Sequence, residues 1–285
     1  MSRIAYVDGR YLASAKAKIS IEDRGFQFAD GVYEVCEVKG GRLIDERRHM
    51  ARLDRSLAAL SIPRPMSEAA LAVVLRETVA RNRVHDGIVY VQITRGAAKR
   101  DFPFPPAPIR PTVVVTARST DQARLTQLAA EGVAVVTMPD IRWGRVDIKS
   151  VALLPNVLAK QSARAQGARE AWLVDAQGRV TEGASSNAWI VTRDGTLVTR
   201  QLGHDILPGI TRAVVLDAVK TQGLSFEERA FTVEEAYAAR EAFITSASQI
   251  VLPVVTIDGR PVGNGAPGLI ATGLRRDYHN YAERA

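Results

Sequence analysis

Lys149 and Glu182 are the two residues whose side chains could act together in one reaction. Lys149 follows Asp147 and Ile148, and Glu182 follows Val180 and Thr181. A lysine amine among apolar neighbours can condense with an aldehyde, and a carboxylate can keep a pyridine nitrogen protonated. These are the two requirements of pyridoxal-phosphate chemistry. Each residue also has an ordinary interpretation, because most lysines are solvated surface charges and Glu182 could be an exposed residue at a strand end.

Two further segments could bind a phosphate group. The run 207–212, Leu-Pro-Gly-Ile-Thr-Arg, opens a predicted helix with glycine just before it, which directs unpaired N–H groups and a hydroxyl at an anion. The run 245–248, Thr-Ser-Ala-Ser, follows a predicted strand and offers more hydroxyl and amide groups. Ordinary helix starts and plain turns share both patterns, so neither segment identifies a site by itself.

The composition limits the class of protein. The chain has 285 residues, of which 46% are hydrophobic and 24% charged, so we expect a globular protein of two domains. Apolar runs stay well below the roughly 20 residues of a membrane helix, and the first residues do not resemble a signal peptide, so we expect a cytoplasmic protein without a membrane partner. Cys36 is the only cysteine, which excludes an intramolecular disulfide and a Cys-based zinc site. We expect Cys36 to be a half-buried strand thiol, and we expect no metal site.

The net charge of +7 raises the alternative of a basic, non-enzymatic nucleic-acid-binding protein. The positive charge comes mainly from arginines spread through the chain. The densest basic stretch, residues 46–55, has acids at both ends and apolar residues at helical spacing, and it lacks the aromatic residues of a nucleic-acid groove. We therefore expect no nucleic-acid partner.

The first part of the chain predicts short strands and two helices. We expect strands at 4–7, 32–38, 42–44, 88–94 and 112–117, and a hairpin turn at Gly40-Gly41. Apolar residues at helical spacing predict one helix from Met50 to Leu60 and another from Leu71 to Val79, with Ser67 as a possible N-cap. The proline-rich run 101–108 predicts a surface loop that could rim an active site.

The second part follows a polar segment, 119–123, which we interpret as a linker. It predicts strands at 133–138, 170–174, 180–181, 188–192, 242–245 and 251–257, a strand that continues through Lys149, and helices at about 154–166, 210–221 and 269–281. Thr232 to Glu235 form a capping-box pattern before a short helix. Strands outnumber helices and often adjoin, so the predicted class is α+β. The predicted domains are a small α/β domain, 1–120, and a larger strand-rich domain, 121–285, that carries Lys149.

Several motifs in their order along the chain resemble the fold-type IV pyridoxal-phosphate-dependent aminotransferases, the superfamily of D-amino-acid and branched-chain transaminases. The resemblance covers almost the whole chain and is strongest to the D-amino-acid group. The motifs occupy residues 23–34, 49–53, 147–150, 156–160 and 181–187.

The resemblance implies a role for each candidate residue with pyridoxal 5′-phosphate as cofactor. Lys149 would be the aldimine lysine and proton carrier, and Glu182 the partner of the pyridine nitrogen. Arg52, which by itself reads as a helix-face charge, would bind the phosphate. The remaining implied cofactor contacts are Leu207 against the ring and Ile210, Thr211, Ser246 and Ala247 around the phosphate. Tyr33 would face the substrate.

The implied reaction is a ping-pong transfer of the amino group of a D-amino acid to a 2-oxo acid such as 2-oxoglutarate. Amino acids and 2-oxo acids would be the substrates, and family members commonly form homodimers. The chain departs from the D-amino-acid pattern at the substrate carboxylate, where an arginine and a histidine two residues later are expected. Arg100 matches the arginine, but Phe102 occupies the histidine position and its side chain cannot donate a hydrogen bond.

Three alternatives on the same fold therefore remain open. One is an (R)-amine transaminase, whose substrate lacks an α-carboxylate, and another is a branched-chain L-amino-acid transaminase. The third is a lyase of the aminodeoxychorismate type, which needs no external 2-oxo acid. An arginine in a mobile loop is the ordinary interpretation of Arg100.

Overall fold

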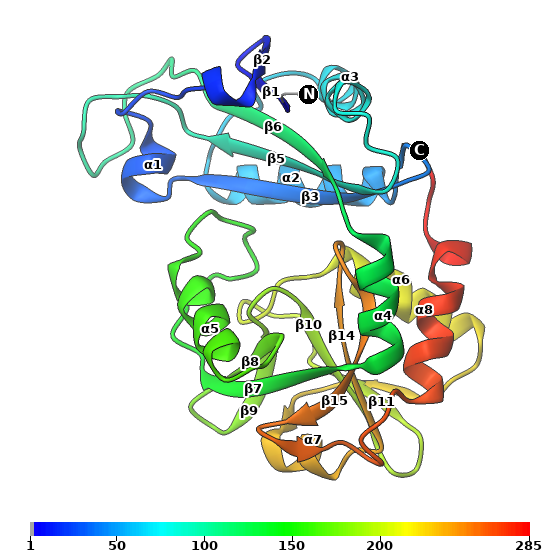
Figure 1. Ribbon diagram of the computed structural model, residues 1–285. Coiled ribbons are helices and arrows are strands. Elements are labelled where there is room, and N and C mark those ends of the chain that lie inside the picture. Colours follow the sequence, from blue (N-terminus) through cyan, green and yellow to red (C-terminus); the bar gives the residue numbers. More distant parts are fainter. Residues whose placement is uncertain (1–2) are drawn as a thin grey trace. The chain divides into compact units, whose positions relative to one another are not determined.

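The computed structural model describes residues 3–285, which divide into two units (Figure 1). The first unit contains the residues up to Asp121 together with Ile148–Ala152 and Glu283–Ala285. The second contains Gln122–Asp147 and Leu153–Ala282. Lys149 therefore packs with the first unit, although it lies far beyond the end of that unit's main segment.

The strands of the first unit are β1 (Ile4–Val7), β2 (Arg10–Ala13), β3 (Gly31–Lys39), β4 (Arg42–Leu43), β5 (Gly87–Thr94) and β6 (Thr112–Ser119). Over the described residues they form a six-stranded sheet in the order β2-β1-β6-β5-β3-β4, and all neighbours are antiparallel. Pairing of β3 with β4 confirms the predicted hairpin at the two glycines.

Two amphipathic helices, α2 (Glu46–Ala59) and α3 (Glu68–Arg81), pack on this sheet. Their predicted apolar stripes are buried with the strand residues in one core. The Ser67 hydroxyl accepts a hydrogen bond from the Ala70 amide at 3.2 Å, which confirms the predicted N-cap. Short helices also occur at η1 (Ser14–Lys16) and α1 (Arg24–Phe28).

Alternation along β3 separates two sets of side chains. Val32, Glu34, Cys36 and Val38 are buried, and the residues between them, beginning with Tyr33, are half-buried. Cys36 is therefore fully buried, whereas we expected a half-buried thiol. Burial raises the pKa of this thiol well above the usual value.

The strands of the second unit are β7 (Val133–Pro139), β8 (Glu170–Val174), β9 (Arg179–Gly183), β10 (Asn187–Val191), β11 (Leu197–Thr199), β12 (Phe226–Glu228), β13 (Phe231–Thr232), β14 (Glu241–Ser246), β15 (Ile250–Ile257) and β16 (Arg260–Pro261). They form one mixed sheet in the order β12-β11-β10-β14-β15-β7-β8-β9-β13, and β16 pairs with β15. The neighbours β15, β7 and β8 run parallel.

The helices of the second unit are α4 (Gln122–Glu131), α5 (Leu154–Ala165), α6 (Ile210–Thr221), α7 (Val233–Ala238) and α8 (Leu269–Tyr281). Ala159 and Ala163 of α5 are buried against residues of β7 and β8. Residues of α4 and α7 contribute to a separate core with the central strands. The capping box at Thr232 and Glu235 is present as predicted, because each side chain bonds the other residue's amide.

The observed mixture of helices and sheets confirms the α+β class. Two local predictions were wrong. Residues 122 and 123 of the predicted linker begin α4, and residues 146–149 form a turn and a bend followed by irregular backbone at Lys149, rather than a strand. The domain boundary after residue 120 stays a prediction, with the difference that the Lys149 segment packs with the first unit rather than with the rest of 121–285.

Candidate active site

The backbone of Lys149 is fixed at both its N–H and its carbonyl within the first unit. The Lys149 carbonyl accepts a hydrogen bond from the Tyr33 amide at 3.0 Å, and the Lys149 amide donates to the Ser56 hydroxyl of α2 at 3.2 Å. The Val151 amide donates to the Gly31 carbonyl, so this segment extends along β3. These bonds explain how Lys149 obtains a defined position without belonging to a strand.

The amine of Lys149 lies over an aromatic side chain. Its Nζ is 4.3 Å from the centre of the Tyr33 ring, and that ring stacks on Tyr90 with 5.6 Å between centres. The Tyr90 hydroxyl donates to the Gln92 side-chain oxygen at 2.7 Å. Burial, with a smaller contribution from Tyr33, raises the pKa of Tyr90 to about 12. Tyr90 is therefore a neutral hydrogen-bond donor at physiological pH.

Arg52 is buried in α2, which excludes the alternative that it is an ordinary charge on the helix surface. Its Nε and Nη2 donate to the two carboxylate oxygens of Glu34 at 2.7 and 2.8 Å, and His49 Nδ1 lies 2.8 Å from the same carboxylate. Burial by itself would raise the pKa of Glu34, but Arg52 and His49 bring it well below the usual value. Arg52 is thus a fixed cation oriented by a buried anion.

The loop that contains Arg100 and Phe102 is anchored to α1. Arg24 Nη1 donates to the Asp101 carbonyl at 2.7 Å and Nη2 to the Phe102 carbonyl at 3.2 Å. The guanidinium of Arg100 lies 4.8 Å from the centre of the Phe28 ring, and the Phe102 ring lies 5.6 Å from the same ring. The Phe102 side chain is exposed and the structure gives it no polar contact, as its chemistry requires.

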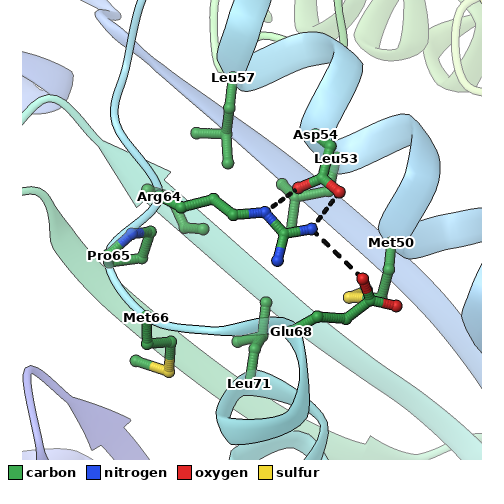
Figure 2. Close-up of a pocket in the computed structure, with 10 residues that line it drawn as sticks. Met50, Leu53, Asp54, Leu57, Arg64, Pro65, Met66, Glu68 and Leu71 are labelled. Carbon is green, nitrogen blue, oxygen red and sulfur yellow. Dashed lines mark hydrogen bonds and ion pairs between the residues drawn. The ribbon is translucent and has the colours of Figure 1, made fainter.

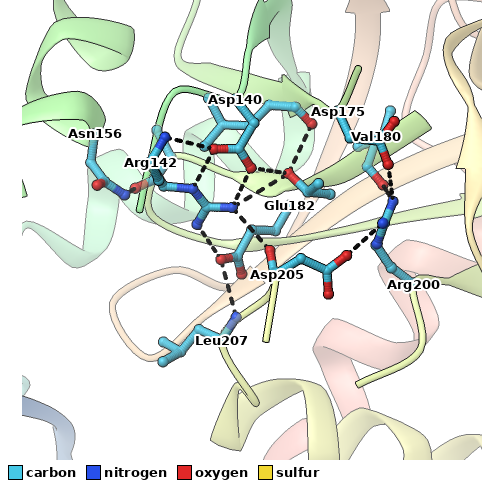
Figure 3. Close-up of polar contacts among 12 residues, drawn as sticks. Asp140, Arg142, Asn156, Asp175, Val180, Glu182, Arg200, Asp205 and Leu207 are labelled. Atoms are coloured by element: carbon cyan, nitrogen blue, oxygen red, sulfur yellow. Dashed lines mark hydrogen bonds and ion pairs between the residues drawn. The ribbon is translucent and has the colours of Figure 1, made fainter. Parts of the chain in front are cut away.

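Glu182 is buried in β9, which excludes the alternative of an exposed strand-end residue (Figure 3). Its Oε1 accepts hydrogen bonds from Arg142 Nη1 at 2.5 Å and from the Leu207 amide at 3.1 Å. Its Oε2 accepts from Asn187 Nδ2 at 2.9 Å. Three donors in different directions define one orientation of this carboxylate.

Arg142 is in turn held by Asp140, which precedes it by two residues in the loop after β7. Its Nε and Nη2 donate to the Asp140 carboxylate at 2.9 and 2.7 Å. Burial alone would raise the pKa of Asp140, but the hydrogen bonds and charge of Arg142 lower it below the usual value. Asp140, Arg142 and Glu182 therefore form a charged network of two carboxylates and one guanidinium.

The start of α6 has the features of an anion site. Gly209 is its N-cap and provides no side chain to satisfy the first amides, those of Ile210 and Thr211. A Cβ on Gly209 would lie only 2.0 Å from the Asn187 side-chain oxygen, so any other residue there would force Asn187 to move. The second unit thus presents helix-terminal N–H groups next to a closely packed glycine.

Ser246, at the end of β14, carries a buried hydroxyl without a hydrogen-bond partner among the described residues. An unsatisfied buried hydroxyl costs free energy, so a ligand that accepts its hydrogen bond would be favoured. Ala247 follows it at the start of the turn before β15. The second unit therefore offers a hydroxyl, helix-terminal amides and a buried carboxylate, which fit a phosphorylated pyridine cofactor.

Several residues of these networks were given no role from the sequence, among them Ser56, Glu34, Arg142 and Asn187, although Glu34 and Asn187 lie within the motifs 23–34 and 181–187. The sequence contained a signal for Glu34, because strand alternation places it on the buried face with Val32 and Cys36, where a carboxylate needs a cationic partner. Arg142 lies in an irregular loop and Ser56 on a helix, so neither has a pattern that reveals its partner.

A small pocket in the first unit has a different lining. Met50, Leu53, Leu57, Met66 and Leu71 form its apolar wall, and Figure 2 shows Arg64 extended across it toward Asp54 and Glu68. None of the predicted site residues lines it. Among residues 3–285 no group of acidic, histidine or cysteine side chains could hold a metal ion, and no helix is long and apolar enough to cross a membrane.

Comparisons with known proteins agree with these features. The family model described as amino-transferase class IV matches residues 31–257. D-alanine aminotransferase of Bacillus licheniformis is 41% identical, over 96% of this chain and 95% of that protein. D-alanine aminotransferase of Staphylococcus aureus (strain MSSA476) is 37% identical, over 98% of this chain and 97% of that protein.

Solved structures show the same fold. The branched-chain aminotransferase of the thermophilic archaeon Thermoproteus uzoniensis, solved with norvaline, has a TM-score of 0.84 and 27% identity, over 100% of this chain and 99% of that chain. The branched-chain enzyme of Escherichia coli has a TM-score of 0.90 at 22% identity, over 98% of this chain and 94% of that chain. The family match and the full-length relatives show that this chain belongs to the class IV aminotransferases, which depend on pyridoxal phosphate.

Proposed function

We propose that this aminotransferase moves the amino group of a D-amino acid, with D-alanine as the first candidate, to a 2-oxo acid such as 2-oxoglutarate. The observation that carries the proposal is the similarity to D-alanine aminotransferases, at 37 to 41% identity over nearly the whole chain. The anchored Lys149 and the buried Glu182 support it, because they supply the amine and the carboxylate that such a reaction needs.

In the first unit, Lys149 is the residue that carries the cofactor and moves the substrate proton. Its fixed backbone leaves the side chain as the moving part, and the Tyr33 ring limits where the amine can go. Arg52 holds the cofactor phosphate. Glu34 keeps the Arg52 guanidinium in one orientation by accepting two of its hydrogen bonds. Tyr33 contacts the substrate.

In the second unit, Glu182 holds the ring nitrogen of the cofactor. The first amides of α6 at Ile210 and Thr211, together with Ser246 and Ala247, bind the phosphate, and Leu207 packs against the ring. Pyridoxal phosphate, when bound, withdraws electrons from the substrate's α-carbon and so makes its proton acidic. The protein's contribution is to orient the cofactor and to provide the amine that takes the proton.

Arg100 binds the substrate carboxylate. A guanidinium can bind a carboxylate with two parallel hydrogen bonds, so Arg100 can act without the histidine that Phe102 replaces. The stacking of Phe28 with both Arg100 and Phe102 supports this assignment, because it limits the loop's freedom. We also propose that the protein is a homodimer, as is common in its family.

A second candidate is transfer from a branched-chain L-amino acid. The observation in its favour is the similarity to solved branched-chain aminotransferases, including the Thermoproteus uzoniensis enzyme at 27% identity. An (R)-amine donor is a third candidate, motivated by Phe102. The higher identity to D-alanine aminotransferases favours the D-amino acid.

The test is a donor panel with pure protein, pyridoxal phosphate and 2-oxoglutarate. We expect 2-oxo acid formation from D-alanine or D-glutamate, and no reaction from the K149A variant. If the protein consumed L-leucine or an (R)-amine but consumed none of the D-amino acids, the proposal would be contradicted. Release of pyruvate from aminodeoxychorismate without an amino acceptor would instead indicate the lyase.

A further inference from the structure

Arg142 contacts the carboxylate that the proposed function assigns to the cofactor's ring nitrogen. Its guanidinium is shared among acceptors of the second unit (Figure 3). Nη1 donates to Glu182 at 2.5 Å, Nε and Nη2 donate to Asp140, and Nη2 also lies 3.2 Å from the Asp205 carbonyl. The side chain is 6% exposed, so water screens these contacts only weakly.

We propose that Arg142 is a positioning residue that orients Glu182 and stabilises its charged form, so that the proton between Glu182 and the cofactor's ring nitrogen rests on the nitrogen. The proposal depends on the proposed function, since it assumes that pyridoxal phosphate binds with its ring nitrogen at Glu182. It adds the reason why that nitrogen is charged.

The basicity of the Glu182 carboxylate decides where the shared proton lies. A buried carboxylate and a pyridine nitrogen can share one proton in two ways, as an ion pair or as a neutral pair, and a site of low dielectric favours the neutral pair. A guanidinium on the carboxylate makes the carboxylate a weaker base. The proton then moves to the nitrogen, where it helps the ring to withdraw electrons.

Asp140 completes the balance of charge. Arg142 alone would neutralise Glu182 and leave little attraction for a positive ring nitrogen. Because Asp140 binds the same guanidinium, the two carboxylates and one guanidinium retain a net negative charge. This charge compensates the proton on the nitrogen, while Arg142 determines which atom carries that proton.

Arg142 also supports the loop before α6, so a structural role must be separated from the electrostatic one. Arg200 provides a matched control, because it is another largely buried arginine bonded to the same loop through Asp205. Its other hydrogen bonds go to Asp175 and the Val180 carbonyl. R200M should therefore loosen the loop without altering the basicity of Glu182.

The experiment is nitrogen-15 NMR of the holoprotein reconstituted with pyridoxal phosphate labelled at the ring nitrogen. In the wild type and in R142K, R200M and D140N at pH 7, we expect the chemical shift of a protonated pyridine. In R142M, we expect a shift toward the unprotonated value. We also expect the dissociation constant for pyridoxal phosphate to rise about tenfold in R142M, because the hydrogen bond between Glu182 and the ring nitrogen would then join neutral rather than charged groups.

D140N tests the balance of charge independently and decides the matter if R142M does not fold. Because it removes one negative charge, its ring nitrogen should lose the proton at a lower pH than in the wild type. A protonated shift in R142M, or an unaltered titration in D140N, would overturn the inference. Failure of the wild type to bind pyridoxal phosphate or to transaminate would instead overturn the proposed function.

Discussion

Glu34 is the residue on which the charge balance of the first unit depends. It lies among apolar side chains of β3 and is the carboxylate that both Arg52 and His49 contact. A buried guanidinium without its anion carries an uncompensated desolvation cost. Glu34 therefore has a structural role even when no cofactor is bound, and this role can be tested on the apoprotein.

Replacing Glu34 by glutamine should destabilise the apoprotein by about 3 kcal/mol, because it removes the carboxylate that pairs with the buried Arg52 charge. The measurement is urea unfolding of E34Q against the wild type. E77Q is the control, since Glu77 forms an exposed ion pair with Arg81, and it should cost less than about 1 kcal/mol. Equal stability of E34Q and the wild type would refute the structural role.

In the proposed site, residue 102 would determine how many hydrogen-bond donors the substrate carboxylate meets. The F102H variant restores a donor, so the KM for a D-amino acid should fall, by about tenfold for one hydrogen bond to a charged group. Steady-state kinetics check this, with F104H as the control because Phe104 lies in the same loop but stacks on Arg95. An unchanged KM in F102H would show that residue 102 does not approach the carboxylate.

At the scale of elements, the start of α6 and the end of β14 provide the proposed phosphate contacts of the second unit. The S246A variant removes the buried hydroxyl that has no partner among the described residues. Pyridoxal phosphate should then bind about tenfold more weakly, which equilibrium titration of the apoprotein would show. S248A, in the same turn, should bind like the wild type. Unaltered affinity in S246A would remove Ser246 from the site.

The buried contact between His49 of α2 and Glu34 of β3 should also make the stability of the protein sensitive to acid. Burial lowers the pKa of His49 below 6.5, its ordinary value. Below pH 6.5 the unfolded chain therefore binds a proton that the folded chain does not, and stability falls as the pH falls. The lowered pKa of Glu34 acts in the same direction below pH 4.5, since the unfolded carboxyl is protonated first.

We therefore expect the free energy of unfolding to decrease from pH 7.5 to pH 5.5, as measured by urea denaturation. In H49Q the contribution of His49 is absent, so the decrease should be smaller. A wild type that becomes more stable on acidification, or an H49Q variant with the same slope, would contradict this account.

The sequence predicted most of these elements because their signals are local. The boundaries of α6 and α8 match the structure, since glycine precedes each helix and apolar residues recur along it. Helix α4 was missed because its polar first residues have the composition of a linker. The irregular backbone at 146–149 was missed because the position of Lys149 depends on Ser56 and Tyr33, which are remote in the sequence.

At the scale of the whole molecule, the resemblance identified the family, but it could not reveal the partners that set each residue's charge. Arg52 and Glu182 were both predicted as site residues. For both, the structure excludes the alternative of an ordinary surface side chain, because both are buried. The networks that bury them join segments far apart in the chain, as Arg142 joins Glu182. Such pairs depend on the tertiary fold and leave no periodic pattern.

Binding of pyridoxal phosphate should stabilise the folded protein. A ligand at a hundred times its dissociation constant adds about 2.7 kcal/mol to the free energy of unfolding, if it binds only the folded state. Thermal unfolding with and without the cofactor tests this, and K149A, which cannot form the covalent bond, should gain less at the same cofactor concentration. Equal gains would show that Lys149 does not carry the cofactor.

Pyridoxal phosphate bound through Lys149 should accept the amino group of a D-amino acid. The direct measurement is the visible spectrum of the holoprotein with one donor at a time and no 2-oxo acid. We predict that D-alanine removes the visible band, that 2-oxoglutarate restores it, and that L-leucine and an (R)-amine leave it unchanged. If L-leucine or the amine removed the band and no D-amino acid did, the assignment of D-amino acids as donors would be contradicted.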